Sequence, residues 1–266
     1  MSDDWQGKYR MMRFSRRGRI LTITLDNPDS LNAVGKVMHD ELATVFTDAA
    51  RDEGSDIVVL TGADRAFSAG GDIAHMQSVV DNPDLFIHEA DQARRIVFSL
   101  LDLEKPIIAR INGHAVGLGA TLALLCDVTF MSEKAKIGDP HVAIGLVAGD
   151  GGAVIWPHLI GFNRAKEYLM TGDLLDAATA ERIGLVNHAV AAEGLDAAVD
   201  AFCDRLAAGS TRAIRWTKSL VNMQLKQIAQ SVMPAGMALE TISAHSVDHA
   251  EAVAAFRDKR PPLFRK

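Results

Sequence analysis

The stretch from Pro106 to Asp127 constrains the fold more than any other part of the chain. Ile107 to Ile111 is a short β-branched run, which the Asn112-Gly113 pair interrupts. Ala115 to Leu125 is then a run of good helix formers that is apolar on every side, and such a helix lies inside a protein. The sequence therefore predicts a strand, a turn and a buried helix.

The first turn of this helix has a chemical consequence. Its backbone N–H groups, near Gly117, Leu118 and Gly119, have no partner within the helix and lie in a dry place. Such donors favour an anion, and glycines let a ligand approach the backbone closely. We expect an anionic group to bind here.

A second glycine-rich loop, earlier in the chain, offers backbone donors of the same kind and helps to interpret the first. Ile57 to Leu60 is a predicted strand, and Phe67 to Asp72 forms a loop in which Gly70 and Gly71 offer further N–H groups. Asp72 directly precedes an apolar helical segment and is therefore a predicted helix N-cap.

Together the two loops, Phe-Ser-Ala-Gly-Gly-Asp-Ile and Asn-Gly-His-Ala-Val-Gly-Leu-Gly-Ala, closely resemble motifs of the crotonase family of enoyl-CoA hydratases and isomerases. The likeness extends over nearly the whole chain. It implies an α/β fold, a spiral of repeated strand-strand-helix units. It also implies an oxyanion hole, in which the N–H groups of Gly71 and Leu118 bind the carbonyl oxygen of an acyl-CoA thioester.

The resemblance also implies where CoA binds. CoA would be carried as part of the substrate, so we expect neither a separate cofactor nor a metal. Its adenine and pantetheine would lie along the first loop, mostly on backbone groups, at Arg65, Ala66, Ser68, Ala69, Asp72 and Ile73. Lys259, Arg260 and Phe264 would approach from the C-terminal tail. The basic tail residues, Arg257, Lys259, Arg260, Arg265 and Lys266, are otherwise explained as an ordinary solvated segment.

The residues for proton transfer depart from the family pattern. Hydratases of the family use two glutamates to orient and activate water, and this chain has Thr121 and His141 at those positions. His141 is our first candidate for the base, because imidazole titrates near neutrality, although a packed histidine bonded to a backbone carbonyl is the alternative. Asp150, flanked by glycines, is either a second base or a turn residue. Asp139 could orient His141.

These candidates leave the reaction open. One base suffices for a 1,3-proton shift, so double-bond isomerisation or a single-base lyase reaction is feasible. Hydration would require a His/Asp pair to replace the two glutamates. A non-catalytic acyl-CoA-binding protein is the alternative from a different functional class.

Two other kinds of site fit the sequence less well. Gly117-Leu-Gly119 follows a strand, as in a Rossmann unit, but Leu122 occupies the third glycine position. His245 and His249 lie one turn apart, as zinc ligands do, but they lack the glutamate of the metalloprotease pattern and a clear third ligand.

The order of elements divides the chain in two. Residues 1–194 are predicted as the spiral core with the acyl-CoA site, and residues 195–266 as a helical oligomerisation segment. Apolar stripes predict helices over Leu195–Leu206, Ile214–Ile228 and Ala238–Phe256. The resemblance implies that this segment packs in a homotrimer, and that trimers pair into hexamers.

Composition limits partners and compartment. A net charge of −6 argues against a nucleic-acid partner. Cys126 and Cys203, the only cysteines, do not indicate a disulfide framework, which fits a reducing compartment. The chain shows no apolar run of membrane-spanning length, and Met-Ser-Asp-Asp-Trp does not read as a signal peptide. We therefore expect a cytoplasmic protein without a membrane partner.

Overall fold

The computed structural model describes residues 3–264. Met1 and Ser2 of the N-terminal stretch, and Arg265 and Lys266 of the basic tail, lie outside the described residues. No helix within the described range is both long and apolar enough to cross a membrane.

The larger sheet has six strands in the order β1-β2-β3-β5-β7-β10. They are β1 (Met12–Arg17), β2 (Ile20–Leu25), β3 (Ile57–Gly62), β5 (Ile107–Ile111), β7 (Val128–Ser132) and β10 (His188–Val190). Only β1 pairs antiparallel, with β2, and the other neighbours are parallel. Every residue of β3 is buried, as expected for a parallel strand covered on both faces.

The smaller sheet has four short strands in the order β4-β6-β8-β9. They are β4 (Ala66–Ser68), β6 (His114–Val116), β8 (Lys136–Gly138) and β9 (Leu175–Asp176). Each of β3, β5 and β7 is followed by one short strand of this sheet and then by a helix. This repetition confirms the predicted spiral of strand-strand-helix units.

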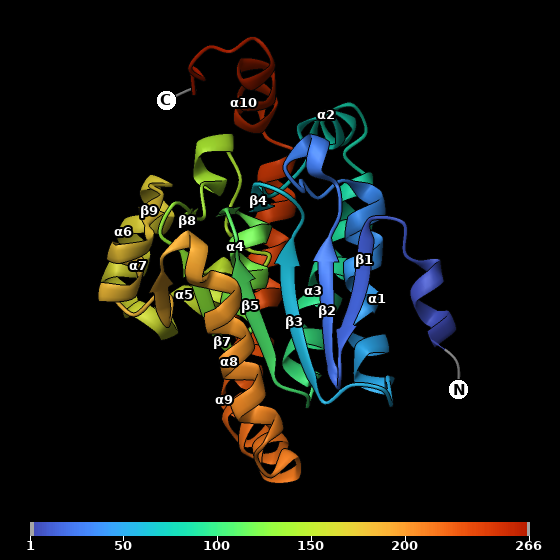
Figure 1. Cartoon of the computed structure of the whole chain (residues 1–266). Coiled ribbons are helices and arrows are strands. Elements are labelled where there is room, and N and C mark those ends of the chain that lie inside the picture. The colour runs from blue at the N-terminus through green and yellow to red at the C-terminus, as the bar shows by residue number, and fades with distance from the viewer. Residues whose placement is uncertain (1–2, 265–266) are drawn as a thin grey trace.

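Helices cover both faces of the larger sheet (Figure 1). They are α1 (Lys36–Arg51), α2 (Ile73–Asp81), α3 (Leu85–Asp102), α4 (Leu118–Leu124), α5 (Gly152–Ile160), α6 (Phe162–Thr171), α7 (Ala177–Arg182), α8 (Leu195–Ala207), α9 (Thr211–Ala244) and α10 (Val247–Arg257), with 3-10 turns η1 (Asp3–Lys8), η2 (Pro28–Ser30), η3 (His141–Ile144) and η4 (Ala192–Gly194). Along β3, Val58 and Leu60 face the cluster that includes α1 and α3, whereas Ile57 and Val59 face α8.

The C-terminal segment is packed onto the rest of the chain. Val199 and Cys203 of α8 join the cluster on the sheet, and Met233 of α9 joins the main core. The last helix, α10, contacts α2 and η3, and Figure 1 shows α10 and α2 at the same end of the molecule. Cys126 and Cys203 are both free and buried, as predicted.

Three predicted boundaries are wrong. The buried helix α4 begins at Leu118 rather than Ala115, because His114–Val116 pairs with β4 and β8. The residue pattern predicts a last strand over Leu185–Val190, but only His188–Val190 forms it. The C-terminal helices are divided elsewhere: α9 runs unbroken to Ala244, and α10 starts after Ser246, whose side chain accepts the N–H of His249.

Candidate active site

A cavity of about 720 Å³ lies between the two glycine-rich loops and the C-terminal helices. Its wall includes residues of the β4–α2 loop, the β6–α4 turn and η3, together with residues of α1, α3, α9 and α10. Most of the sequence candidates meet at this one cavity.

Two glycines allow the two loops to touch. A Cβ on Gly70 would lie 2.7 Å from the carbonyl oxygen of Val116, and a Cβ on Gly117 would lie 3.8 Å from the Cα of Gly70. Both glycines have positive φ, of 84° and 54°. A side chain at position 70 would therefore push the loops apart, and at position 117 a non-glycine residue would strain the backbone. Gly71 and Leu118, the residues that follow, both line the cavity.

The amides of Gly71 and Leu118 are available to a ligand. Val34 pairs with the first loop through two hydrogen bonds, one to the carbonyl of Gly70 and one from the N–H of Asp72. The N–H of Gly71 takes no part in this pairing. Leu118 is the first residue of α4. Within residues 3–264, neither amide has a hydrogen-bond acceptor.

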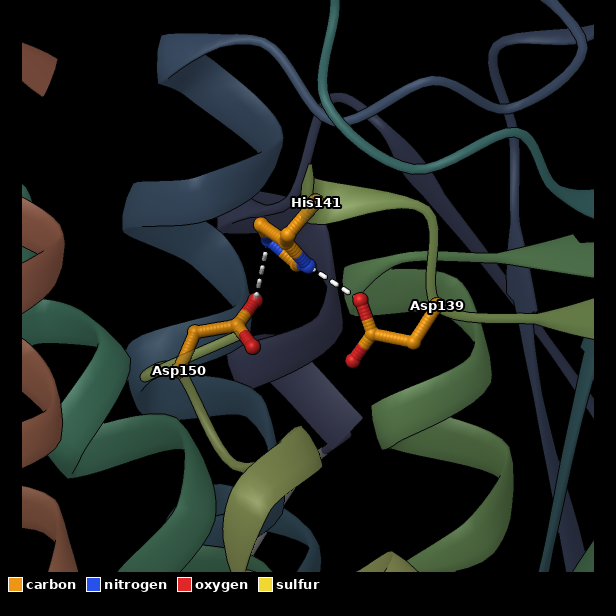
Figure 2. Close-up of side chains that lie close together, drawn as sticks. All are labelled: Asp139, His141 and Asp150. Atoms are coloured by element: carbon orange, nitrogen blue, oxygen red, sulfur yellow. Dashed lines mark hydrogen bonds and ion pairs between the residues drawn. The ribbon is translucent and has the colours of Figure 1, made fainter. Parts of the chain in front are cut away.

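His141 lies between two aspartates (Figure 2). Its Nδ1 is hydrogen-bonded to Asp139, which is almost completely buried, and its Nε2 lies 3.6 Å from Oδ2 of Asp150. The other oxygen of Asp150 is buried without a hydrogen-bond partner among the described residues. The contact with Asp139 fits the orienting role considered for it, and His141 and Asp150 both line the cavity.

The cluster holds protons near neutral pH. Burial acts to lower the pKa of His141, but the charge of Asp139 and then that of Asp150 outweigh it and raise this pKa well above its ordinary value. Burial raises the pKa of Asp150, and the charge of His141 only partly offsets it. The arrangement therefore favours a cationic His141 beside a carboxyl group that can exchange a proton.

Glu240 of α9 also belongs to this cluster, although sequence reasoning missed it. Its Oε1 lies 3.9 Å from Nε2 of His141, and its Oε2 accepts the N–H of Gly149 at 3.1 Å. Burial, and then the charge of Asp150, raise the pKa of Glu240 well above its ordinary value. The sequence did contain a signal, because the buried positions of α9 between Ala229 and Ala244 are apolar except for Glu240.

We expect Glu240→Gln to stabilise the protein increasingly as the pH rises. The folded-state pKa of Glu240 lies above its unfolded value of about 4.3, so the wild type loses stability as pH rises from that value to the folded pKa. Glutamine does not titrate and can still accept the N–H of Gly149. Urea unfolding between about pH 5 and 7 should show the variant gaining up to about 1.4 kcal/mol per pH unit relative to the wild type. A difference in unfolding free energy that does not change with pH would contradict the raised pKa of Glu240.

The backbone of α9 lies against the loop at Gly149, and this close approach places Glu240 at the cavity. A Cβ on Gly149 would lie 2.3 Å from the carbonyl oxygen of Gly236 in α9. Gly149→Ala should therefore cost about 1–3 kcal/mol of unfolding free energy. Gly7→Ala is the control, because a Cβ at Gly7 meets nothing within 4 Å. Equal stability of the two variants in urea unfolding would show that this contact tolerates a methyl group.

Thr121, at the position of the first family glutamate, is fully buried in α4. Its hydroxyl has no hydrogen-bond partner among the described residues. A hydroxyl there can bind a water molecule but cannot act as a base near neutrality.

Only some of the residues expected to bind CoA line the cavity. Arg65, Ala69, Asp72 and Ile73 line the cavity. Asp72 also caps α2 as predicted, by accepting the N–H of His75. The cavity lining includes neither Ala66 and Ser68, which are buried in β4, nor Lys259 and Phe264 of the described part of the tail. Arg260, the other tail residue expected near CoA, does line the cavity, together with Phe256 and Pro262.

The site contains histidine and carboxylate donor atoms of the kind that bind metal ions. Asp139, His141 and Asp150 offer donor atoms that all lie within 4.8 Å of one another. Nδ1 of His141 already bonds directly to Asp139, which leaves Nε2 as its remaining donor. The other histidine pair is also engaged: Nδ1 of His245 bonds to the carbonyl of Thr241, and Nδ1 of His249 to that of Ile144.

Comparisons with known proteins agree with the geometry. Residues 15–266 match the family model described as enoyl-CoA hydratase/isomerase. A crotonyl-CoA hydratase of Syntrophomonas wolfei is 31% identical, over 96% of this chain and 98% of that protein. An enoyl-CoA hydratase/isomerase structure from Mycobacterium paratuberculosis has a TM-score of 0.88 at 34% identity, over 92% of this chain and 97% of that one. A monofunctional enoyl-CoA isomerase from M. smegmatis has a TM-score of 0.69 at 29% identity, over 82% and 94%.

Proposed function

Because this chain belongs to the enoyl-CoA hydratase/isomerase family, we propose that it adds water to the double bond of a 2-enoyl-CoA. The observation that carries the proposal is the placement of His141, Asp150 and Glu240 on the cavity that Gly71 and Leu118 also line. Carbonyl-binding groups and water-activating groups would thereby face one substrate.

The two amides supply the electrostatic part of the reaction. Water adding to C3 pushes the electrons of the double bond onto the thioester oxygen, which becomes an enolate oxygen. Preorganised N–H groups from Gly71 and Leu118 stabilise that charge, and one such donor contributes about 3–4 kcal/mol in comparable oxyanion holes. The enolate then takes a proton at C2.

The acidic cluster supplies the water. The separations of 3.6 Å and 3.9 Å from Nε2 of His141 to Asp150 and Glu240 are longer than direct hydrogen bonds. A bridging water satisfies groups at such separations. Asp150 takes the proton of this water, because its neighbour His141 is cationic and Asp139 holds the imidazole in place. His141 thus orients the base and stabilises its charge.

Hydration fits this site better than isomerisation. A 1,3-proton shift needs one base, whereas here two carboxyl groups, of Asp150 and Glu240, lie within 4 Å of Nε2 of His141. The CoA portion would extend along the first loop toward Arg65 and Arg260. Arg260 is already paired with Glu251 and Asp258, whereas Arg65 has no ion pair among the described residues, so its charge remains for a CoA phosphate.

The proposal is tested with purified protein and a panel of 2-enoyl-, 3-enoyl- and 3-oxoacyl-CoA thioesters, with products identified by mass spectrometry. We expect 3-hydroxyacyl-CoA from the 2-enoyl substrate, at the same rate with and without EDTA. Conversion of the 3-enoyl substrate alone would indicate an isomerase, and cleavage of the 3-oxoacyl substrate a hydrolase. Binding without turnover would indicate a non-catalytic acyl-CoA-binding protein.

The exposed apolar side chains of α9 support a homotrimer, or a hexamer of paired trimers, as the state in which the protein acts. Trp216, Leu220, Val221 and Met223 are all more than half exposed in the single chain. Light scattering after size-exclusion chromatography distinguishes these states from a monomer.

A further inference from the structure

His39, in the first turn of α1, lines the same cavity as His141 and Asp150. No sequence motif marks this residue, because it precedes both glycine-rich loops and lies in an ordinary amphipathic helix. Its surroundings nevertheless prepare it for proton transfer.

Hydrogen bonds fix which nitrogen of His39 carries a hydrogen. The amide nitrogen of Gln92 donates to the carboxylate of Asp40 and lies 3.0 Å from Nε2 of His88. The carbonyl oxygen of Gln92 therefore faces His39, 2.9 Å from its Nδ1. Because that oxygen only accepts, Nδ1 of His39 is the donor, and Nε2 remains to gain or lose a proton.

This network does not change when His39 changes charge. The Nδ1–H bond to Gln92 is made by neutral and by cationic imidazole alike. Burial acts to raise the pKa of Asp40, but hydrogen bonds from Gln92 and Lys36 keep it below its ordinary value. Asp40 therefore remains a carboxylate that holds the Gln92 amide in this orientation.

His39 and the catalytic residues His141 and Asp150 line one cavity. Burial has the largest effect on the pKa of Asp150, followed by the charges of His141 and Asp139. The charge of His39 comes next and lowers this pKa. One oxygen of Asp150 has no hydrogen-bond partner among the described residues. Asp150 thus lies within the electrostatic reach of two imidazoles that line one cavity.

The two imidazoles differ in the partners of their protons. Nδ1 of His141 is bonded to a carboxylate, and its Nε2 faces the carboxyl groups of Asp150 and Glu240. Carboxylates on both sides hold the protons of His141 in place. The Nδ1 partner of His39 is a neutral amide instead, and its Nε2 has no carboxylate partner among the described residues.

We propose that His39 is a second catalytic residue, which delivers the proton to C2 after water has added to C3. The inference rests on the proposed hydration. Asp150 takes a proton from water, whose oxygen bonds to C3. The Nε2–H bond of His39 then breaks, its electrons stay on nitrogen, and the enolate pair forms the new C2–H bond. Transfer of the proton from Asp150 back to His39 completes the addition of one water molecule.

His39→Asn tests this role, because the asparagine amide can replace the Nδ1–H bond to Gln92 but has no counterpart of Nε2. His88→Asn is the matched control: His88 contacts the same glutamine, its side chain is 65% exposed, and it does not line the cavity. Two rates are measured, hydration of 2-butenoyl-CoA and deuterium exchange at C2 of butyryl-CoA in D₂O. Exchange at C2 requires the enolate but no addition of water.

We expect His39→Asn to lower both rates about 100-fold at unchanged thermal stability. His88→Asn should keep both rates, and free imidazole should partly restore exchange in His39→Ala. Wild-type rates in His39→Asn, or equal losses in His39→Asn and His88→Asn, would overturn the inference while leaving hydration intact. A wild-type protein that neither hydrates nor exchanges would refute the proposed function as well.

Discussion

Replacing Asp150 with asparagine is expected to lower kcat for hydration about 10²- to 10⁴-fold, because the side chain keeps its shape but loses the ability to take a proton from water. The KM for the enoyl-CoA should change little, since the carbonyl-binding amides and the CoA wall are untouched. Steady-state kinetics of the purified variant measures both constants.

Asp173→Asn serves as the control, because Asp173 is exposed and does not line the cavity. The Asp150 variant should also show a lower His141 pKa in an NMR titration, since one of the charges that raise it is gone. A kcat within tenfold of the wild type would place the base elsewhere in the cluster.

Leu118→Pro is expected to have the second large effect, a loss of about 10²- to 10³-fold in kcat. Proline removes one of the two amide hydrogens that we assign to the thioester oxygen. Helix α4 should survive, because Leu118 is its first residue, where a missing N–H breaks no helical hydrogen bond.

Leu118→Met is the matched variant, since it keeps the amide and nearly the same side-chain volume. Circular dichroism and thermal unfolding should show both variants folded, with only the proline variant inactive. Comparable activity in the two variants would mean that the Leu118 amide does not bind the substrate oxygen.

Local signals in the sequence predicted local structure well. Asp72 is predicted as a cap, and it accepts the N–H of His75 three residues later, a bond that depends only on neighbouring positions. The uniformly apolar run before Leu125 correctly indicated a buried helix. The short strand His114–Val116 was missed, because such a three-residue segment is defined by its partners in the sheet rather than by its own pattern.

The long C-terminal helix shows a second limit of pattern reading. Exposed apolar residues such as Trp216 and Leu220 blur the stripe that marks the buried face of α9. The chain therefore gave the impression of two shorter helices. The real break follows Ala244, where Ser246 caps the next helix.

Half of the candidate site was foreseeable. The two loops carry motifs long enough to identify, and His141 and Asp150 follow from their place in the chain. The contact of Asp139 with His141 depends on the turn at Pro140 that opens η3. Glu240 and His39 lie on helices far from the motifs in sequence, and only the tertiary packing of α9 and α1 brings them to the cavity.

A crystal structure of the Asp150→Asn variant with bound 2-butenoyl-CoA tests the proposed site most directly. We predict the thioester oxygen at about 3 Å from the amide nitrogens of both Gly71 and Leu118, with C3 facing the side chain at position 150. A thioester oxygen that contacts neither amide, or an acyl group bound away from the His141 cluster, would contradict the proposed chemistry.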